Sequence, residues 1–236
     1  MFMKKLSIII PVYNEKNTIE ETIKRVESVN IESLEKDIIL IDDCSNDGTR
    51  EILEKYKARH KVIFLEKNLG KGYAVRQGFK EAAGDMTIIQ DADLEYDPAD
   101  YRELVKPLLE ERADAVYGSR FLGGMADKNK IAYKRGYFFS RLLNRFSNFL
   151  NGAGLSDIYT CYKVFSREAL NEISPRLVSN RFGIEVELTA YLAKNGFKIK
   201  EVPISYRGRT YEEGKKINWK DGLAAIWHIV RFNLFH

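Results

Sequence analysis

Two aspartates separated by one residue follow an apolar run, where they could hold a divalent cation. The run 86–90 contains Ile88 and Ile89 and leads directly into Asp91 and Asp93. Mg2+ and Mn2+ prefer oxygen ligands and usually keep positions open for substrate phosphates. The pair therefore suggests a site for a metal ion and a diphosphate, such as that of a nucleotide-sugar, although turn formation alone would also favour aspartates here.

The elements that would position these aspartates alternate between strands and helices. Apolar runs rich in β-branched residues predict strands at 6–12, 37–42, 61–65, 86–90, 115–118 and 198–204. Segments of helical period predict helices at 18–30, 50–59, 72–83, 98–111, 184–195 and 222–235. This order favours an α/β fold with a mostly parallel sheet and helices on both faces. The strand at 198–204 contains Pro203 and is expected at an edge.

Polar loops follow the first, second and fourth predicted strands. They begin at Pro11, Asp42 and Asp91, and the second runs through Asp47-Gly48-Thr49. Ligands of open α/β sheets bind beyond the carboxyl ends of the strands, so these loops should converge on one site. A tight turn and helix cap would also explain the Asp47 segment, and that role is compatible with ligand binding.

Length and composition suit one large, buried α/β core. The chain has 236 residues, 44% of them hydrophobic and 31% charged, with a formal net charge of +4. Cys44 and Cys161 lie far apart without the spacing of metal ligands, so we expect two reduced thiols in a cytoplasmic protein. No apolar run reaches the roughly eighteen residues of a membrane-spanning helix, so membrane contact should be peripheral.

The second half contains a basic segment interleaved with apolar residues at helical spacing. The basic residues are Lys128, Lys130, Lys134, Arg135, Arg141 and Arg145. The apolar ones are Phe138, Phe139, Leu142, Leu143, Phe146, Phe149 and Leu150. A basic amphipathic helix suits a membrane surface, although such charges also occur on ordinary solvated faces. The apolar stripe of 222–235, with Trp227, suits either the core or the same interface.

The motifs together resemble those of family 2 glycosyltransferases with the GT-A fold, close to the dolichol-phosphate mannose synthases. They occupy 8–15, 42–49, 68–72 and 91–93, in the order and spacing of that group. The resemblance implies a Rossmann-like GT-A domain over 1–236. Its nucleotide-sugar half would span 1–120, and its acceptor half, with interfacial helices, 121–236.

The resemblance also implies roles for single residues. The nucleotide-sugar would be bound by Pro11, Tyr13, Asn14, Glu15, Asp42, Asp43, Lys71, Asp91 and Lys215. Asp91, Asp93 and Glu95 would hold Mg2+ or Mn2+, which makes Asp93 a catalytic residue. The segment 206–219 resembles a mobile acceptor loop whose Arg209 would neutralise the diphosphate during bond cleavage, with a disordered basic loop as the alternative.

The resemblance also implies that an acceptor phosphate would be bound by Arg120, Arg135 or Lys134, Ser140 and Lys163. The physical reason for arginine there is that its guanidinium forms strong paired hydrogen bonds with phosphate. Lys163 could instead be a solubilising residue of an edge strand. Glu185 and Glu187 lie near where many relatives place a catalytic acidic residue. At positions i and i+2 of a helix they face different directions, so only one should point into the site.

The expected activity is metal-dependent, inverting transfer of a sugar to a polyprenyl or dolichyl phosphate. The donor would be GDP-mannose, UDP-glucose or UDP-N-acetylglucosamine. The protein would sit peripherally on the cytoplasmic membrane face, without a nucleic-acid partner. Two alternatives stay open: transfer to a glycan or protein hydroxyl, which needs a base such as Glu185 or Glu187, and a non-catalytic nucleotide-binding scaffold on the membrane.

Overall fold

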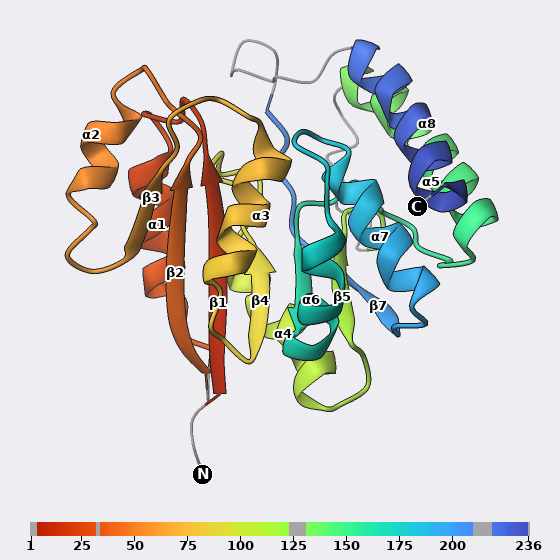
Figure 1. The fold of residues 1–236 in the computed structure, drawn as a ribbon, viewed down its shortest axis with the longest axis horizontal. Coiled ribbons are helices and arrows are strands. Elements are labelled where there is room, and N and C mark those ends of the chain that lie inside the picture. The colour runs from red at the N-terminus through yellow and green to blue at the C-terminus, as the bar shows by residue number, and fades with distance from the viewer. Residues whose placement is uncertain (1–3, 32–33, 123–130, 210–218, 236) are drawn as a thin grey trace.

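The computed structural model describes residues 4–31, 34–122, 131–209 and 219–235, and for 131–138, 219–221 and 223 only the path of the helix. These residues form one seven-stranded sheet of order β3-β2-β1-β4-β6-β5-β7 (Figure 1). The strands are β1 Lys4–Val12, β2 Leu34–Asp42, β3 Lys61–Phe64, β4 Met86–Ile89, β5 Ala115–Ser119, β6 Lys163–Ser166 and β7 Ile199–Pro203. Only β6 runs antiparallel to its neighbours, which confirms the predicted mostly parallel sheet.

The centre of the sheet is continuously apolar because helices cover both faces. Ile8 of β1 pairs with Ile38 of β2 and Ile88 of β4, and at most 5% of each residue is exposed. A strand buried on both faces has no polar face to alternate with, so its residues form an unbroken hydrophobic run. This rigid centre ends at the loops that carry the polar residues.

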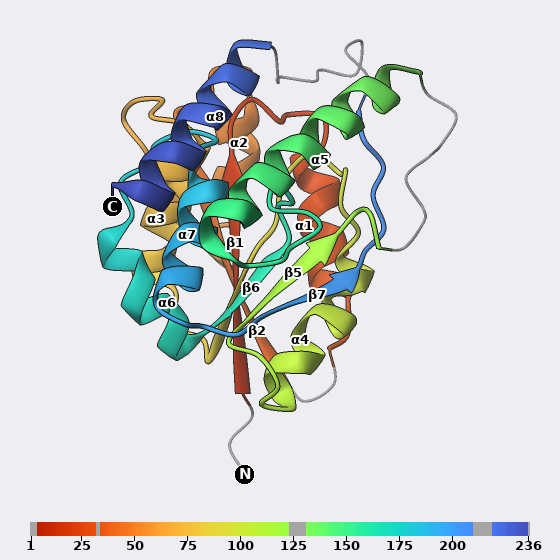
Figure 2. The ribbon, with the colours of Figure 1, turned by 90° about the vertical axis from the view of Figure 1, so that its right-hand side faces the viewer.

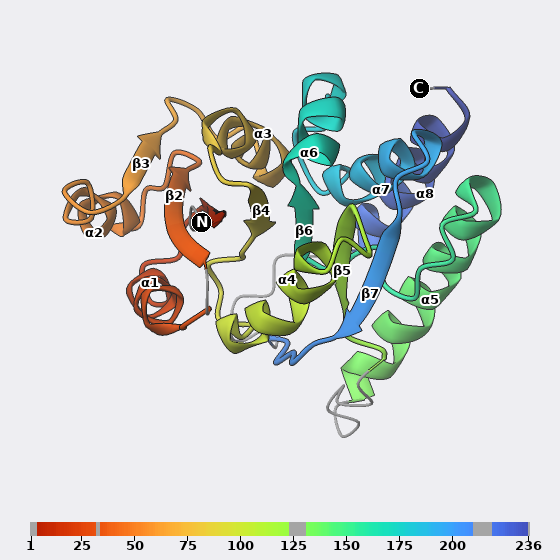
Figure 3. The same cartoon turned by 90° about the horizontal axis from the view of Figure 1, so that it is seen from below.

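Helices lie on both faces (Figure 3). On one face are α1 Ile19–Ser28 and α4 Tyr101–Leu109; on the other are α3 Lys71–Glu81 and α6 Arg167–Ile173. The short helix α2 Thr49–Glu54 lies beside β3, and 3-10 turns occupy Pro98–Asp100 and Ser174–Arg176. The α3 helix begins at Lys71, within the Gly-rich segment 68–72.

Three further helices pack together near the β7 end of the sheet: α5 Ile131–Asn151, α7 Ile184–Lys194 and α8 Trp219–Leu234 (Figures 1 and 2). Leu143, Val186 and Ile229, one from each helix, form a small buried cluster between them. Within the described ranges, no helix is both long and apolar enough to cross a membrane.

Most predicted elements are confirmed, including β7 at an edge, but the place of β6 was not foreseen. The segment before Lys163 leads into a strand between β4 and β5, near the middle of the sheet. The edge-strand interpretation of Lys163 is therefore wrong. The second helix is also shorter than predicted, ending at Glu54.

Candidate active site

The loops after β1, β2 and β4 converge, as predicted. The backbone amide of Asn14 donates to Ser45 Oγ at 2.9 Å, and that of Glu15 donates to Thr49 Oγ1 at 3.0 Å. Each loop also holds one non-glycine residue with left-handed backbone: Asn14, Cys44 and Leu94, with φ of 52°, 62° and 62°. Such strained residues gather where the surrounding structure fixes a functional geometry.

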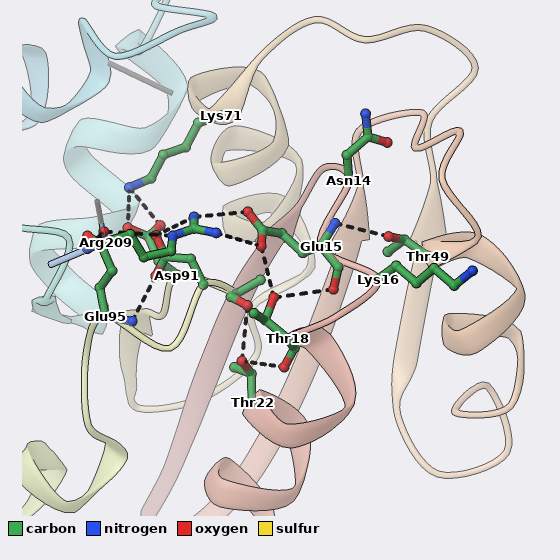
Figure 4. A network of polar contacts seen from close by, with 12 residues as sticks. Asn14, Glu15, Lys16, Thr18, Thr22, Thr49, Lys71, Asp91, Glu95 and Arg209 are labelled. Carbon is green, nitrogen blue, oxygen red and sulfur yellow. Dashed lines mark hydrogen bonds and ion pairs between the residues drawn. The ribbon is translucent and has the colours of Figure 1, made fainter. Parts of the chain in front are cut away.

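Arg209 joins the first and fourth loops by binding their carboxylates (Figure 4). Its guanidinium donates to both oxygens of Glu15, at 3.1 and 3.2 Å, and to Asp93 Oδ2 at 3.1 Å. The Nε atom lies 3.8 Å from Glu95 Oε1. A residue that follows β7 thus places its charge among three acidic side chains.

Glu95 anchors the segment that carries Arg209. The Tyr206 hydroxyl donates to Glu95 Oε2 and the backbone amide of Arg209 to Glu95 Oε1, both at 2.7 Å. The amide of Arg207 donates to the Glu95 carbonyl oxygen at 2.9 Å. In this structure Glu95 therefore positions Arg209, and its metal-binding role stays a prediction.

A second group of charges forms a row of alternating sign that leads inward from the D-x-D motif, Asp91-Ala92-Asp93. Lys71 Nζ lies 2.8 Å from Asp91 Oδ1 and 3.2 Å from Glu185 Oε1. Glu185 Oε2 in turn accepts from Lys163 Nζ. The row thus joins the loop after β4, the start of α3, the start of α7 and strand β6.

The acidic cluster favours added positive charge. Burial raises the pKa of Asp93 to about 7, with further increase from the neighbouring Asp91 and Glu95 carboxylates, while Arg209 opposes the shift. In the second group, burial lowers the pKa of Lys163, and Glu185 opposes that shift. A carboxylate whose ionised form is disfavoured in this way is stabilised by an approaching cation.

Asp42 and Asp43 shape the loops instead of lining an open pocket. The Asp43 carboxylate accepts from the amides of Leu69 and Gly70, at 2.8 and 2.7 Å. Asp42 is fully buried and lies 3.4 Å from Arg50 Nε. Asp42 and Asp43 thus hold the loops of the site in this structure, and their predicted contact with the nucleotide-sugar stays a prediction.

The Gly-rich segment packs tightly against the chain before α7. Gly70 has a φ of 97°, and a Cβ atom there would lie 2.6 Å from the carbonyl oxygen of Asn180. Glu187 holds this second segment by accepting from the amides of Val178 and Ser179, each at 2.8 Å. Glu187 is thus structural and Glu185 faces the site, which confirms that only one of the two points inward.

The residues expected to bind an acceptor phosphate are not all accessible. Arg120 forms a two-pronged pair with Asp157, at 2.7 and 2.8 Å, and its guanidinium lies 5.0 Å from the ring centre of Tyr206. Lys163 is fully buried, so the expectation that it touches a lipid phosphate is wrong for this structure. Ser140 is half-buried on α5.

The side chains of Arg135 and Lys134, and all of Lys215, lie outside the described residues. Pro11 and Tyr13 are half-buried beside the converging loops. Asp157 was not singled out from the sequence. Its role depends on Arg120, 37 residues earlier, and no local pattern announces such a pairing.

A Mg2+- or Mn2+-type ion suits Asp91 and Asp93. Among the described side chains, no three acidic, histidine or cysteine groups are arranged to hold a metal, so Asp91, Asp93 and Glu95 do not form a ready-made trio. Mg2+, however, is usually bound by one or two carboxylates and completed by substrate phosphates. Both aspartates already bind cationic groups, Lys71 and Arg209, which shows that the site accommodates positive charge.

A mostly parallel sheet whose polar loops meet at the strand ends is typical of α/β folds that bind ligands beyond the carboxyl ends of the strands. The chain belongs to glycosyl transferase family 2, because the sequence model of that family matches residues 7–174. The match confirms the resemblance drawn from the motifs.

Two relatives illustrate the family. The chain is 31% identical over 207 residues to Glycosyltransferase AglJ of Haloferax volcanii, covering 86% of this chain and 63% of that protein. It is 28% identical over 231 residues to the dolichol-phosphate mannosyltransferase of Pyrococcus furiosus, covering 96% and 63%. The chain thus spans less than two thirds of the length of either relative.

Solved structures show the same fold. The glucosyl-3-phosphoglycerate synthase of Mycobacterium tuberculosis, crystallised with Mn2+, uridine diphosphate and phosphoglyceric acid, superposes with a TM-score of 0.71 at 20% identity. The match covers 99% of this chain and 80% of that one. It confirms the predicted GT-A fold.

Proposed function

We propose that the chain transfers a sugar from a nucleotide-diphosphate sugar to a polyprenyl phosphate, such as dolichyl phosphate. One observation carries the choice of acceptor. Both oxygens of Glu185 are bound by lysines, and both oxygens of Glu187 by backbone amides. Neither candidate base is placed to take a proton from a hydroxyl, whereas a phosphate acceptor is already anionic and needs no base.

The donor would lie across the converging loops. Pro11 lies at the end of β1, and Tyr13, Asn14 and Glu15 follow it, at the place where nucleotides bind in such folds. GDP-mannose, UDP-glucose and UDP-N-acetylglucosamine are the candidate donors. The Pyrococcus relative, a dolichol-phosphate mannosyltransferase, supports a mannosyl donor and a dolichyl phosphate acceptor. The mycobacterial synthase, crystallised with uridine diphosphate, supports a uridine nucleotide.

Mg2+ or Mn2+ would be held by Asp91 and Asp93, and when bound would supply positive charge to the leaving diphosphate. The chain contributes two further cations. Arg209, which binds Asp93 here, would turn to the donor phosphates, whereas Lys71 would reach them from its place beside Asp91 and Glu185. Catalysis would then depend on orientation and on charges set in place before reaction, with direct attack inverting the anomeric carbon.

The protein would bind the acceptor lipid where α5 and α8 contact the membrane. These neighbouring helices, and Phe235 directly after α8, expose large apolar side chains; on the helices these are Phe139, Leu142, Phe149, Ile226, Trp227 and Leu234. Phe149 is 84% exposed, and Arg141 and Arg145 are exposed on the same helix. Apolar side chains beside basic ones suit an anionic surface, which here would be the cytoplasmic membrane face.

The decisive experiment incubates the purified protein with each candidate donor and a short polyprenyl phosphate, with Mn2+ or with chelator. We expect metal-dependent glycolipid formation from one donor. Product with a hydroxyl acceptor but none with the lipid would contradict the proposed acceptor and favour transfer to a glycan or protein hydroxyl. Nucleotide binding without product from either acceptor would identify a non-catalytic module.

Membrane contact is tested separately by sedimentation with anionic vesicles. The variant Phe149→Ser/Trp227→Ser should bind less than wild type. Val178→Ser removes another exposed apolar side chain, 45% exposed, that belongs to neither α5 nor α8, and should bind as wild type does. Equal binding by all three proteins would contradict the assigned surface.

A further inference from the structure

Lys163 is a fully buried lysine in a strand near the middle of the sheet. Its ammonium group donates to the carbonyl oxygen of Thr160 and to Glu185 Oε2, and lies 4.8 Å from the ring centre of Tyr117. Burying a charge is costly even when it is paired, and an apolar residue of similar size would usually serve stability as well or better. A role beyond folding is therefore worth seeking.

The partner of Lys163 connects it to the site. Glu185 uses its second oxygen, Oε1, to bind Lys71 Nζ at 3.2 Å. Lys71 also binds Asp91, and 18% of its side chain is exposed, against none of the Lys163 side chain. The row thus begins in the interior and ends at a lysine that solvent, and hence a ligand, can reach.

The order of the contacts gives each residue a distinct task. A glutamate held only by Lys71 could turn with that lysine, because both side chains have several rotamers. Lys163 fixes the carboxylate from the side opposite Lys71, and its own ammonium is held by the Thr160 carbonyl. With one oxygen thus fixed, Glu185 presents the other to Lys71 in a single place.

We propose that Lys163 is a positioning residue for the donor: it fixes Glu185, and Glu185 holds the Lys71 ammonium beside Asp91, where Lys71 meets the diphosphate. The inference rests on the proposed function and refines it, because it moves Lys163 from the acceptor side to the donor side. Lys163 itself touches neither substrate.

The two assignments of Lys163 predict opposite kinetic results. If it positions Lys71, removing its charge weakens nucleotide diphosphate binding about tenfold, the lower end of effects seen for residues that support metal ligands, and leaves the KM for polyprenyl phosphate unchanged. If it contacts the acceptor phosphate, that KM rises and nucleotide binding stays the same.

A variant that replaces both members of the buried pair, Lys163 and Glu185, controls for effects on folding. Lys163→Met alone leaves Glu185 with an unbalanced buried charge, whereas Lys163→Met/Glu185→Met replaces the pair by apolar side chains, a change that is often neutral for stability. Lys163→Met therefore tests the role of Lys163, the double variant controls for folding, and Lys71→Met is the reference for complete loss of the Lys71 contact.

The measurement is calorimetric titration with UDP and with GDP in the presence of Mn2+, alongside the KM for polyprenyl phosphate. We expect Lys163→Met and the double variant each to lose about tenfold in affinity, and adding Lys71→Met to either to cause no further loss beyond Lys71→Met itself, because all three changes act through one contact. Wild-type affinity in either variant, losses that simply add, or a raised acceptor KM would overturn the inference alone. Failure of the wild-type protein to bind either nucleotide would overturn the proposed function and this inference with it.

Discussion

Two groups of paired charges meet at the D-x-D motif, and they are built in different ways. In the first, Arg209 reaches Glu15 and Asp93 from a segment that follows edge strand β7, and 18% of its side chain is exposed. In the second, Lys163 and Glu185 belong to β6 and α7, inside the packed fold, with 0% and 6% of their side chains exposed.

The difference indicates which cation can leave. Arg209 is held by hydrogen bonds at the rim, so it can give up its carboxylates while the sheet stays intact. Lys163 cannot leave Glu185 without leaving a charge in the interior, which is strongly unfavourable. We infer that the first group exchanges its cation for a metal ion, and that the second provides fixed support for Lys71.

The largest effect is expected at the metal carboxylates. Asp93→Asn removes one charge from the exchangeable group, and transfer should fall about a hundred- to thousandfold, as for other single groups that stabilise a developing charge. Initial rates with saturating Mn2+ measure the loss. Glu103→Gln, an exposed glutamate on α4, is the control and should keep the wild-type rate. Undiminished transfer by Asp93→Asn would remove the aspartate from the mechanism.

The two groups should also differ in how much they contribute to the free energy of unfolding. Lys163→Met should lower the free energy of unfolding by about 3–5 kcal/mol, because it leaves Glu185 buried without one of its partners. Arg209→Met should cost about 1 kcal/mol or less, since a partly exposed ion pair contributes little. Urea denaturation measures both. A loss at Arg209 as large as that at Lys163 would show that the rim group is equally part of the folded core.

The pH dependence of metal binding gives a smaller test of the exchangeable group. With the pKa of Asp93 raised to about 7, a proton competes with the ion below neutral pH, so Mn2+ affinity should rise about tenfold from pH 6 to pH 8. The stability of the metal-free protein should change with pH in the opposite direction to the Mn2+ affinity. A pKa above the ordinary 3.8 means that the contribution of Asp93 to stability is greatest at low pH and is lost as pH rises toward 7. A flat Mn2+ profile in wild type would contradict the raised pKa.

The sequence predicted the strands and helices that carry the site better than the side-chain contacts between them. Hydrophobic runs located the strand before Asp91, and helical geometry separated Glu185 from Glu187, because both signals are local. The contact between Glu15 and Arg209 spans 194 residues and depends on the path of the whole chain. Nothing near Lys163 indicated that its strand would enter the sheet antiparallel between β4 and β5.

Acceptor-side residues were the least predictable for the same reason. Arg120 suits a phosphate by its chemistry, yet the structure pairs it with Asp157, itself held by Glu201 of β7 through its backbone amide at 3.0 Å. The type of a residue indicates which groups its side chain can bind, but the tertiary structure determines which of them lies next to it.

The most direct test of the exchange is Mn2+ binding by Arg209→Met without nucleotide, measured by titration against wild type. Arg207→Met changes the same charge at an exposed neighbouring position and serves as the control. If Arg209 and the ion compete for the same carboxylates, the variant should bind Mn2+ about fivefold more tightly, the equivalent of about 1 kcal/mol for a partly exposed ion pair. Affinity equal to or weaker than that of wild type and the Arg207 variant would contradict the exchange.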